Sequence, residues 1–343
     1  MFRNCFLIKR NVNKSLHLVL RNDFFTEFET KILRFQSKQK ELSMINLEEK
    51  RQQVNKFLNE KTDSKVLYDN VKSILYLGKT DEDFKLILKC IEKLNDEASS
   101  EFKIHCSFIR LLYSLNRIDV ALECFKNEKL RNIFMQDLKS IVVILDKLIE
   151  DKKYDEALQF FRTYIKNMKK VPSSILNAVT LCLLKINSKE SLLEAKNLVE
   201  YCNTKKFSLN LNSIVQIFML SINQKDYLFA LNFLGKTNRV SFSVHNNLLA
   251  IIFSCMNQPI QSLTHLNNLV LDTKLDSVVF KTTLDYIENS IGLSNNKDLL
   301  TKYENIKKDL IQRKKHKNED IVEFYSKSSE GVFSKNAKKF YEK

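Results

Sequence analysis

Glycine and proline are almost missing from this sequence, which has four Gly, two Pro and no Trp among 343 residues. Tight turns between strands depend on glycine and proline, whereas helix interiors avoid both. Leu, Ile, Lys, Asn, Phe and Glu dominate the composition instead. With so few glycines, the chain has no G-x-x-x-x-G-K or G-x-G-x-x-G phosphate loop and no G-x-S-x-G nucleophile turn. The composition therefore predicts an all-α protein.

Patterns typical of catalytic or metal sites are also missing. No two of the seven cysteines have C-x-x-C spacing, their number is odd, and most lie among Leu, Ile and Phe. Such thiols indicate a reducing compartment and argue against a disulfide framework or a zinc site. The five histidines form no ligand pair at helical spacing, and the carboxylates lie on charged helix faces. We therefore predict no enzyme, no metal and no cofactor.

No stretch of the sequence is apolar enough to cross a membrane. Residues 240–271 carry no formal charge, but polar residues and Pro259 interrupt them, and the longest apolar run there is Leu248–Phe253. A spanning helix needs about 20 apolar residues. No integral membrane span is predicted.

Basic residues outnumber acidic ones, since 56 Lys and Arg face 41 Asp and Glu and give a formal net charge of +15. A basic balance favours a polyanionic partner, which is RNA, DNA or an anionic membrane surface. The abundance of Lys and Asn is also typical of proteins from AT-rich genomes, which is the alternative explanation of the charge.

A small residue returns at nearly constant intervals, with steps of 36, 38, 35 and 32 residues, at Ala121, Ala157, Ala195, Ala230 and Ser262. Each follows a polar turn and precedes an aliphatic or aromatic residue four positions later. A period in the mid-thirties is typical of stacked helical hairpins. We therefore predict a right-handed α-solenoid of stacked helical hairpins with a period of about 35 residues.

Each hairpin is expected to pair a strongly apolar first helix with a more amphipathic second helix. The first helices are expected near residues 102–115, 137–150, 173–186, 209–222, 243–256 and 277–291. The second helices are expected near residues 82–94, 118–129, 154–168, 190–202, 226–236, 260–271 and 297–312. Helices that are apolar all round are buried on several sides, as happens when neighbouring hairpins enclose them.

Four segments follow from charge and periodicity. Residues 1–22 contain five basic residues, no acid and interspersed apolar residues, which is typical of a mitochondrial presequence; an ordinary basic first helix is the alternative. Residues 23–65 are expected to form charged leader helices, residues 66–312 the repeat array, and residues 313–343 a basic and aromatic C-terminal tail.

The hairpins resemble degenerate pentatricopeptide repeats. In that family the turn and second helix follow a D/E-E-A-x-x-x-F pattern, to which Asp155–Phe161 and Asp119–Phe125 are similar. His245–Leu249 is similar to the Y-N-T-L-I pattern of the family's first helix. The resemblance covers about residues 80–310, and it points to fungal members that act in mitochondrial gene expression.

This resemblance implies binding of single-stranded RNA, with one base read by each repeat. Carried over to this sequence, the base-facing positions able to hydrogen-bond are Ser107, Gln216 and Asn247. The second reading position of the family is often Asn or Asp, whereas the matching residues here are apolar, at Phe102, Leu138, Leu211 and Phe242. This departure weakens the expectation of a readable base code.

A basic run near the end of the array comprises Arg313, Lys314, Lys315 and Lys317. One interpretation is a phosphate-binding patch that adds sequence-independent affinity for RNA. The other is favourable placement of cations at a helix C-terminus.

Together these patterns favour an RNA-binding helical-repeat protein of the mitochondrial matrix, with the inner-membrane surface as a second location. Its partner would be a mitochondrial RNA, either mRNA or rRNA, and its role stabilisation, maturation or translation activation of a transcript. A structural subunit or assembly factor of the mitochondrial ribosome is the alternative. A protein–protein adaptor for respiratory-complex assembly is a second alternative.

Overall fold

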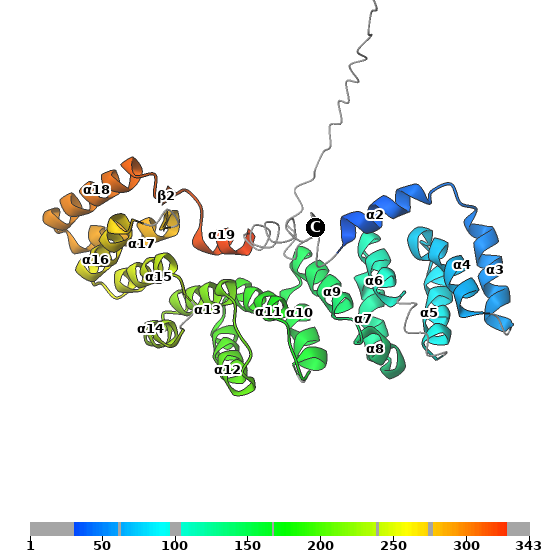
Figure 1. Ribbon diagram of the computed structural model, residues 1–343. Helices are drawn as coiled ribbons and strands as arrows, with labels where there is room; N and C mark the ends of the chain where they lie inside the picture. Colours follow the sequence, from blue (N-terminus) through cyan, green and yellow to red (C-terminus); the bar gives the residue numbers. More distant parts are fainter. Residues whose placement is uncertain are drawn as a thin grey trace, which may run out of the picture.

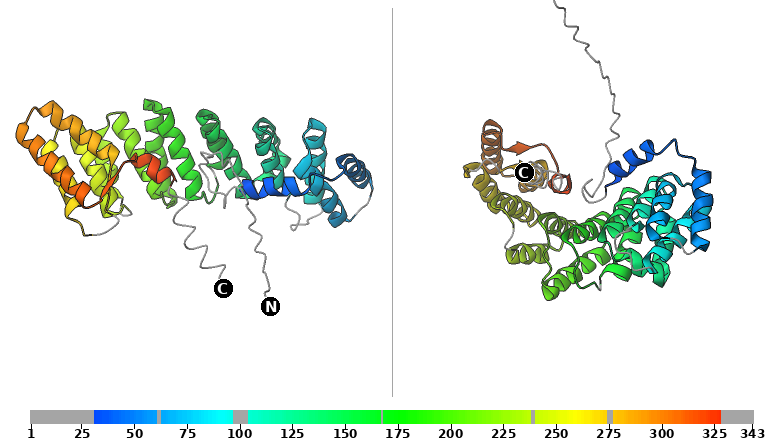
Figure 2. Two further views of the ribbon diagram at one scale, coloured as in Figure 1. Left: turned by 90° about the horizontal axis from the view of Figure 1, so that it is seen from above. Right: turned by 45° about the vertical axis from the view of Figure 1, so that its right-hand side comes forward.

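The computed structural model describes residues 31–60, 63–96, 104–166, 168–237, 240–273 and 277–327. Over these residues, helical hairpins stack side by side into a curved band (Figure 1). The first helices line the concave side, here called the inner layer, and the second helices line the convex side, the outer layer (Figures 1 and 2). The predicted all-α solenoid is confirmed. A single short parallel pair, β1 (Val279–Phe280) with β2 (His316–Lys317), is the β-structure in this part of the chain.

The inner layer holds the first helix of each hairpin. These helices are α4 (Ser64–Leu77), α6 (His105–Ser114), α9 (Leu138–Glu150), α11 (Ser173–Ile186), α13 (Leu211–Asn223), α15 (Phe242–Cys255) and α17 (Lys281–Ser294). Each packs on the next inner helix along the array. Three of them bury unbroken runs, Ser140–Ile149, Ile175–Leu183 and Ser213–Ile222. These helices are apolar around most of their circumference because neighbours cover them on several sides.

The outer layer holds the second helices. They are α5 (Asp81–Asp96), α7 (Ile118–Lys126) with α8 (Glu128–Phe134), α10 (Tyr154–Phe160) continued by the π-helix η1 (Phe161–Ile165), α12 (Lys189–Lys205), α14 (Tyr227–Lys236), α16 (Pro259–Leu271) and α18 (Lys297–Gln312). The helix expected at 118–129 is shorter than predicted, because Asn127 starts a new helix by accepting a hydrogen bond from the Leu130 N–H.

Asparagine and lysine replace glycine in the turns between the two helices of a hairpin. A left-handed residue with φ between 51° and 60° occurs in six consecutive hairpins, at Asn116, Lys152, Asn187, Lys225, Asn257 and Asn295. At the first of these turns the Arg117 N–H reaches back to the Leu112 carbonyl over 2.8 Å. Asparagine tolerates this backbone conformation better than most residues. The array therefore closes its tight turns with very little glycine.

At position 78, directly after α4, glycine is required because there is no room for a Cβ atom, and not because the backbone angle is unusual. A Cβ at this position would lie 2.7 Å from the Ile74 carbonyl oxygen, well inside van der Waals contact. The glycine lets the chain turn closely under α4 into α5.

The periodic small residues lie where the two helices of each hairpin meet. Ala121, Ala157, Ala195, Ala230 and Ser262 are each at most 1% exposed. The Ser262 hydroxyl lies 2.7 Å from the Ala250 carbonyl oxygen and 2.7 Å from the Ser254 Oγ, both on α15. Larger side chains at these positions would separate the two helix backbones.

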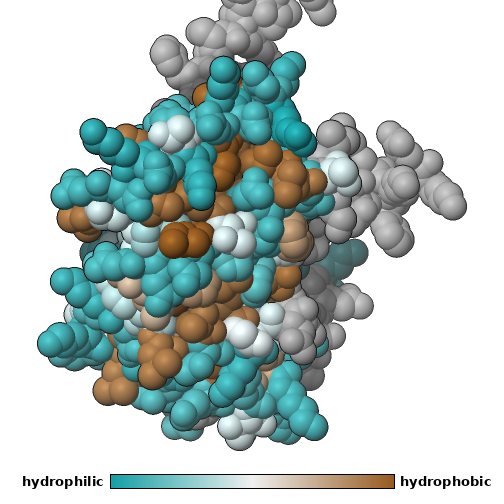
Figure 3. Space-filling model, turned by 90° about the vertical axis from the view of Figure 1, so that its left-hand side faces the viewer, coloured by the Kyte–Doolittle hydropathy of each residue, from teal (hydrophilic) through white to brown (hydrophobic). Residues whose placement is uncertain are grey.

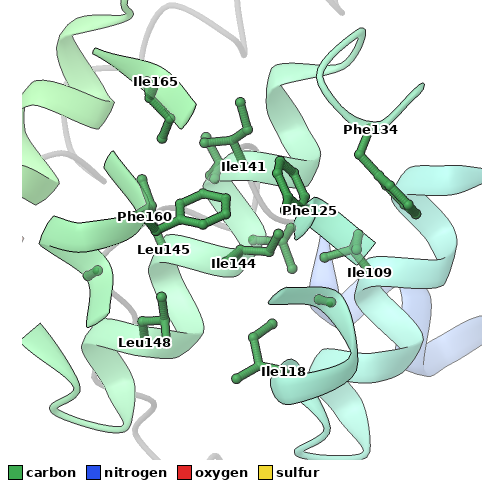
Figure 4. Packing of buried hydrophobic residues seen from close by; sticks show 14 of the residues in the cluster. Ile109, Ile118, Phe125, Phe134, Ile141, Ile144, Leu145, Leu148, Phe160 and Ile165 are labelled. Carbon is green, nitrogen blue, oxygen red and sulfur yellow. The ribbon is translucent and has the colours of Figure 1, made fainter. Parts of the chain in front are cut away.

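Buried hydrophobic residues form three clusters along the described part of the array: the first extends from Ile32 to Phe233, and the other two lie in the hairpins of its C-terminal part. Figure 4 shows the centre of the first cluster, where Phe125 of α7 and Phe160 of α10 face Ile144 and Leu148 of α9. The rings of Phe125 and Phe160 meet edge to face, with centroids 4.9 Å apart. Each hairpin thus buries its apolar faces only by packing on its neighbours.

The terminal helices fold back from the two ends of the band onto its concave side (Figures 1 and 2). At one end α2 (Ile32–Glu41) packs on α4 and α6, and α3 (Leu47–Asn59) packs on α4. The Gln39 amide of α2 donates to the Tyr76 carbonyl over 2.8 Å. At the other end α19 (Ile321–Lys327) packs on α13 and α17. The two terminal helices therefore narrow the open inner surface of the array.

Helices α2 and α3 fall within the charged leader predicted at residues 23–65, and β2 and α19 fall within the C-terminal tail predicted at residues 313–343. The presequence predicted at 1–22 lies outside the described residues, as do residues 328–343. Within the described ranges, no helix combines the length and the apolar composition that crossing a bilayer requires.

Candidate nucleic-acid interface

Asn247, a predicted base-reading residue, lies on α15 against α17 and has no exposed surface. Its amide nitrogen donates to the carbonyl oxygens of Ser243 and Val278, each over 2.8 Å. Its Oδ1 accepts from the Phe280 N–H at 3.3 Å and from the Thr283 hydroxyl at 2.8 Å. All the hydrogen-bonding capacity of this amide is used between two neighbouring hairpins. The Asn247 side chain therefore joins hairpins and offers no group to a base edge.

Gln216, the second predicted base reader, is 1% exposed on α13. Its Oε1 accepts a hydrogen bond of 2.5 Å from the Thr180 hydroxyl of α11. Its amide nitrogen is also buried inside the protein. Like Asn247, this side chain lies in the contact between consecutive inner helices rather than on a surface that RNA could reach.

Ser107, the third predicted base reader, lies near the start of α6 and is half-buried. It stands three hairpins away from Gln216 along the array. The three residues therefore do not form one exposed surface, and an RNA contact at Ser107 stays a prediction.

The basic run at the end of α18 lies against the end of α16. The Lys315 ammonium donates to the carbonyl oxygens of Leu269 at 2.8 Å and Val270 at 3.2 Å, and also to that of Asp272. Arg313 donates to the same Val270 carbonyl at 3.3 Å. These carbonyls belong to the C-terminus of α16, where helical partners are lacking and positive charge is favourable. Of the two interpretations of this run, the helix-end role has direct contacts, although the helix is α16 and not α18.

The other two residues of the run differ in their surroundings. The Lys317 ammonium lies 4.5 Å from the centroid of the Phe324 ring of α19, which is a cation–π contact. Lys314 adopts a left-handed backbone with φ of 53° and is exposed. A phosphate contact by Lys314 stays a prediction, while Arg313, Lys315 and Lys317 join elements of the protein.

A groove of about 630 Å³ opens on the outer layer between α12 and α14. None of the site residues predicted from the sequence lines this groove. Its apolar wall includes half-buried Val199, Phe207 and Phe229 and buried Phe233. The Phe229 and Phe233 rings stack with centroids 5.8 Å apart and planes inclined by 11°. Aromatic surface of this kind suits the flat face of a nucleobase.

Charged residues surround the aromatic wall. Lys196, Lys206 and Lys236 line the groove together with one carboxylate, Glu200. The Lys196 ammonium lies 5.0 Å from the Phe229 ring centroid and forms an ion pair of 2.6 Å with Asp226. The ion pair lowers the pKa of Asp226, although partial burial opposes the shift. Lys206 and Lys236 are exposed at the rim.

Lysines continue along the edge of the array on which this groove opens. They lie in the turns that join consecutive hairpins or at the helix ends that lead into these turns, and all are exposed, at Lys166, Lys169, Lys170, Lys205, Lys206 and Lys236. The Tyr201 hydroxyl of α12 donates to the Lys166 carbonyl, which ties one of these turns to the next hairpin. Repetition of the hairpin thus places cations from three successive turns on one side of the molecule.

The distribution of charge along the sequence indicates this basic surface. Residues 162–236 contain 11 basic and 4 acidic residues, whereas residues 237–312 contain 7 of each. The excess of cations is therefore concentrated in the hairpins around α12 and α14. The net charge of single hairpins, rather than that of the whole chain, therefore indicates this surface.

A metal site needs a cluster of ligand side chains. No cluster of three or more His, Cys, Asp or Glu among the described residues could hold a metal ion. Burial raises the pKa of the Cys90, Cys124 and Cys182 thiols to about 12, so they stay protonated at neutral pH.

Two curated proteins are similar to this chain. One is a pentatricopeptide repeat-containing protein 2, mitochondrial, from Mus musculus, which is 27% identical over 249 residues covering 71% of this chain and 62% of the mouse protein. The other is the protein of the same name from Xenopus laevis, 30% identical over 98 residues covering 27% of this chain and 25% of the frog protein. The chain thus spans less than two thirds of either relative.

No protein-family model matches the chain. The two relatives support the resemblance to pentatricopeptide repeats that the hairpin pattern indicates. Both come from vertebrates, so they give no support to a specifically fungal group.

Proposed function

We propose that this protein binds RNA in mitochondria and acts in organellar gene expression, by stabilising a transcript, aiding its maturation or activating its translation. The observation that carries the proposal is an α-solenoid with lysines from consecutive turns on one edge, beside an aromatic groove. Exposed cations along an extended scaffold can contact successive phosphates of a nucleic acid strand.

The relatives add the compartment to this proposal, because both are mitochondrial pentatricopeptide repeat-containing proteins by name. The basic, acid-free residues 1–22 favour the same compartment. We propose that the protein is located in the mitochondrial matrix, either free or attached to the inner face of the inner membrane.

Crosslinking in intact mitochondria tests the proposal. A tagged copy of the protein is irradiated with ultraviolet light, purified under denaturing conditions, and its attached RNA is sequenced. Enrichment of one or a few mitochondrial transcripts over an untagged control is expected, together with binding in vitro that weakens steeply as salt rises. Recovery of no more RNA than the untagged control would contradict the proposal.

Protein contact is the second candidate function, and exposed apolar residues favour it. Leu193, Leu228 and Ile260, near the starts of successive second helices, are 60%, 71% and 65% exposed. Leu293 and Leu300 are exposed at the last hairpin, and Figure 3 shows apolar surface mixed with hydrophilic surface at that end of the band. Exposed apolar residues in register suit a protein surface, such as a mitochondrial ribosomal subunit, or an adaptor role in respiratory-complex assembly.

Sedimentation distinguishes the two candidates. Stoichiometric comigration with one ribosomal subunit at high salt would support a structural role on the ribosome. Migration in light fractions, with bound RNA, would support a factor for particular transcripts. Association with membrane proteins that survives RNase treatment would support the adaptor role.

A further inference from the structure

The position of RNA on this protein follows from which polar groups the fold leaves available. Gln216 and Asn247 of the inner layer are buried and hydrogen-bonded to neighbouring hairpins. Folded back from the two ends of the band, α2 and α19 cover part of the concave side, over α4 and α6 and over α13 and α17. A strand lying along the inner layer would therefore find two of the three predicted contact residues inaccessible.

The outer groove between α12 and α14 offers the contacts that the inner positions lack. Its volume of about 630 Å³ exceeds that of a nucleoside, and its wall carries the exposed parts of Phe207 and Phe229. Base-to-aromatic contact tolerates any base, because every base has a flat π-face. An aromatic wall beside exposed lysines is the arrangement used by proteins that hold single strands.

The three lysines of the groove differ in how far their charge is neutralised by the protein. Lys196 is held between Phe229 and Asp226, so its charge is already balanced within the protein. Lys206 and Lys236 are exposed on opposite sides of the groove, at the ends of α12 and α14. Glu200 in the lining opposes an anion there. The net charge of the groove lining is nevertheless positive.

We propose that the groove between α12 and α14 is the site at which this protein holds single-stranded RNA, with a base against Phe207 and Phe229 and phosphates on Lys206 and Lys236. The strand continues along the lysines of the neighbouring turns, Lys205 on one side and Lys166, Lys169 and Lys170 beyond it. This inference rests on the proposed RNA-binding function and puts the contact at the outer edge of the array, away from the inner helices that carry Gln216 and Asn247.

The chain supplies its own control in the groove between α7 and α10, which has a volume of about 410 Å³. That groove also has an aromatic wall, from Phe160 and Tyr164. Its lining carries three carboxylates, on Asp119, Glu123 and Glu156, against two lysines, Lys126 and Lys153. Lys126 forms an ion pair of 2.5 Å with Glu123. We expect this groove to repel an RNA strand.

The test compares two double variants that change net charge by the same amount. One is Lys206→Glu with Lys236→Glu, and the control is Lys126→Glu with Lys153→Glu. All four side chains are exposed, so both variants should fold, which circular dichroism and thermal unfolding verify. Binding of fluorescein-labelled 20-nucleotide RNAs (oligo(U), oligo(A) and a randomised pool) is measured by anisotropy over a range of salt concentrations.

We expect the Lys206 and Lys236 double variant to lose affinity by about tenfold or more and the slope of log affinity against log salt to fall by about 1.4, or about 0.7 for each lost phosphate contact. The control should lose much less, because the same change in net charge acts there only at long range. Crosslinked nucleotides should map by mass spectrometry to peptides containing Phe207 or Phe229.

Equal losses in the two double variants, with the wild-type protein binding RNA, would overturn the groove assignment and leave the proposed function intact. A wild-type protein that binds none of the three RNAs would overturn both. In that case an acidic amphipathic helical peptide, tested in the same assay, would show whether the groove takes a protein partner instead.

Discussion

The grooves between α7 and α10 and between α12 and α14 occupy equivalent places in the outer layer, yet their charges differ in sign. Both lie between consecutive second helices and both have aromatic walls. Three carboxylates oppose two lysines in the first, whereas one carboxylate opposes three lysines in the second. The same hairpin architecture therefore presents two surfaces of opposite charge, because the fold constrains the buried positions and leaves the rims free.

The difference extends to whole regions of the chain. Residues 81–161 contain 13 basic and 16 acidic residues, against 11 and 4 in residues 162–236. In the first region, cations are balanced by carboxylates of the adjacent hairpin, as in Arg117 with Asp81 and Lys129 with Asp96, each at 3.0 Å. In the second region most lysines lack a comparable supply of carboxylates, so their charge is available to a polyanion.

The largest expected effect concerns the carboxylates of the first region. Asp83 is 1% exposed and accepts from Arg51 Nε at 2.7 Å and Nη2 at 3.0 Å. Burial alone would raise its pKa, but Arg51 and the backbone N–H groups of Lys79 and Thr80 hold the pKa below its ordinary value. Asp83→Asn should lower the free energy of unfolding at pH 7 by about 2–3 kcal/mol, since it leaves Arg51 without its charged partner.

A group whose pKa is lowered on folding stabilises the protein above its unfolded pKa of about 3.9 and loses that effect as pH falls through the folded value. The difference between wild type and Asp83→Asn should therefore be full at neutral pH and shrink below about pH 4. Hydrogen exchange should rise in α3 to α5 and stay unchanged in α12 to α14, because stability in a solenoid is local. Uniform loss of protection along the chain would contradict this expectation.

The second effect tests whether the inner layer contributes to stability without contributing to RNA binding. Asn247→Ala removes four hydrogen bonds and leaves the Thr283 hydroxyl and the Phe280 N–H buried without a partner. The free energy of unfolding should fall by about 2 kcal/mol. RNA affinity of the folded protein, measured by anisotropy well below the unfolding temperature, should stay unchanged. A selective loss of RNA binding without loss of stability would restore Asn247 as a base reader.

A third effect is expected when the acidic groove between α7 and α10 is made basic. Glu123→Lys with Glu156→Lys should let the groove between α7 and α10 bind RNA and raise affinity by up to about tenfold at low salt. The matched control adds the same charge outside both grooves, at exposed Glu190 and Glu304. If the control gained as much affinity as the groove variant, net charge rather than groove geometry would explain RNA binding.

The smallest effect isolates the aromatic contact. Phe229→Leu keeps an apolar side chain of similar size but removes the π-face, so RNA affinity should fall by about fivefold with little change in stability. Tyr164→Leu makes the corresponding change in the groove between α7 and α10 and should leave RNA affinity unaltered. Anisotropy titrations of the two variants side by side measure the difference.

Much of the fold could be predicted from the sequence, because its signals are local and repeated. The scarcity of glycine and proline predicts helices, and the spacing of Ala121, Ala157, Ala195 and Ala230 predicts the hairpin period. The left-handed Asn and Lys residues of the turns gave no such signal, because asparagine and lysine occur throughout the chain. The end of α7 at Lys126 was missed for a similar reason, since Asn127 is one of many potential caps.

The candidate site could be predicted only in part. The basic run at Arg313–Lys317 is conspicuous in the sequence, but nothing local reveals that Lys315 reaches the carbonyls at the end of α16, more than forty residues earlier. The lysines beside the outer groove are dispersed in the sequence, from Lys166 to Lys236. Their proximity depends on the register with which one hairpin stacks on the next.

The sequence by itself determined the helical class, the repeat length and the closeness of the two helices in each hairpin, since these depend on neighbours along the chain. The tertiary structure alone decided which polar residues face outward. In α13 and α15 apolar residues surround the helix, so no amphipathic stripe fixes its rotation, and one residue of slip turns a side chain by about 100°. That rotation, set by packing between hairpins, buried Gln216 of α13 and Asn247 of α15.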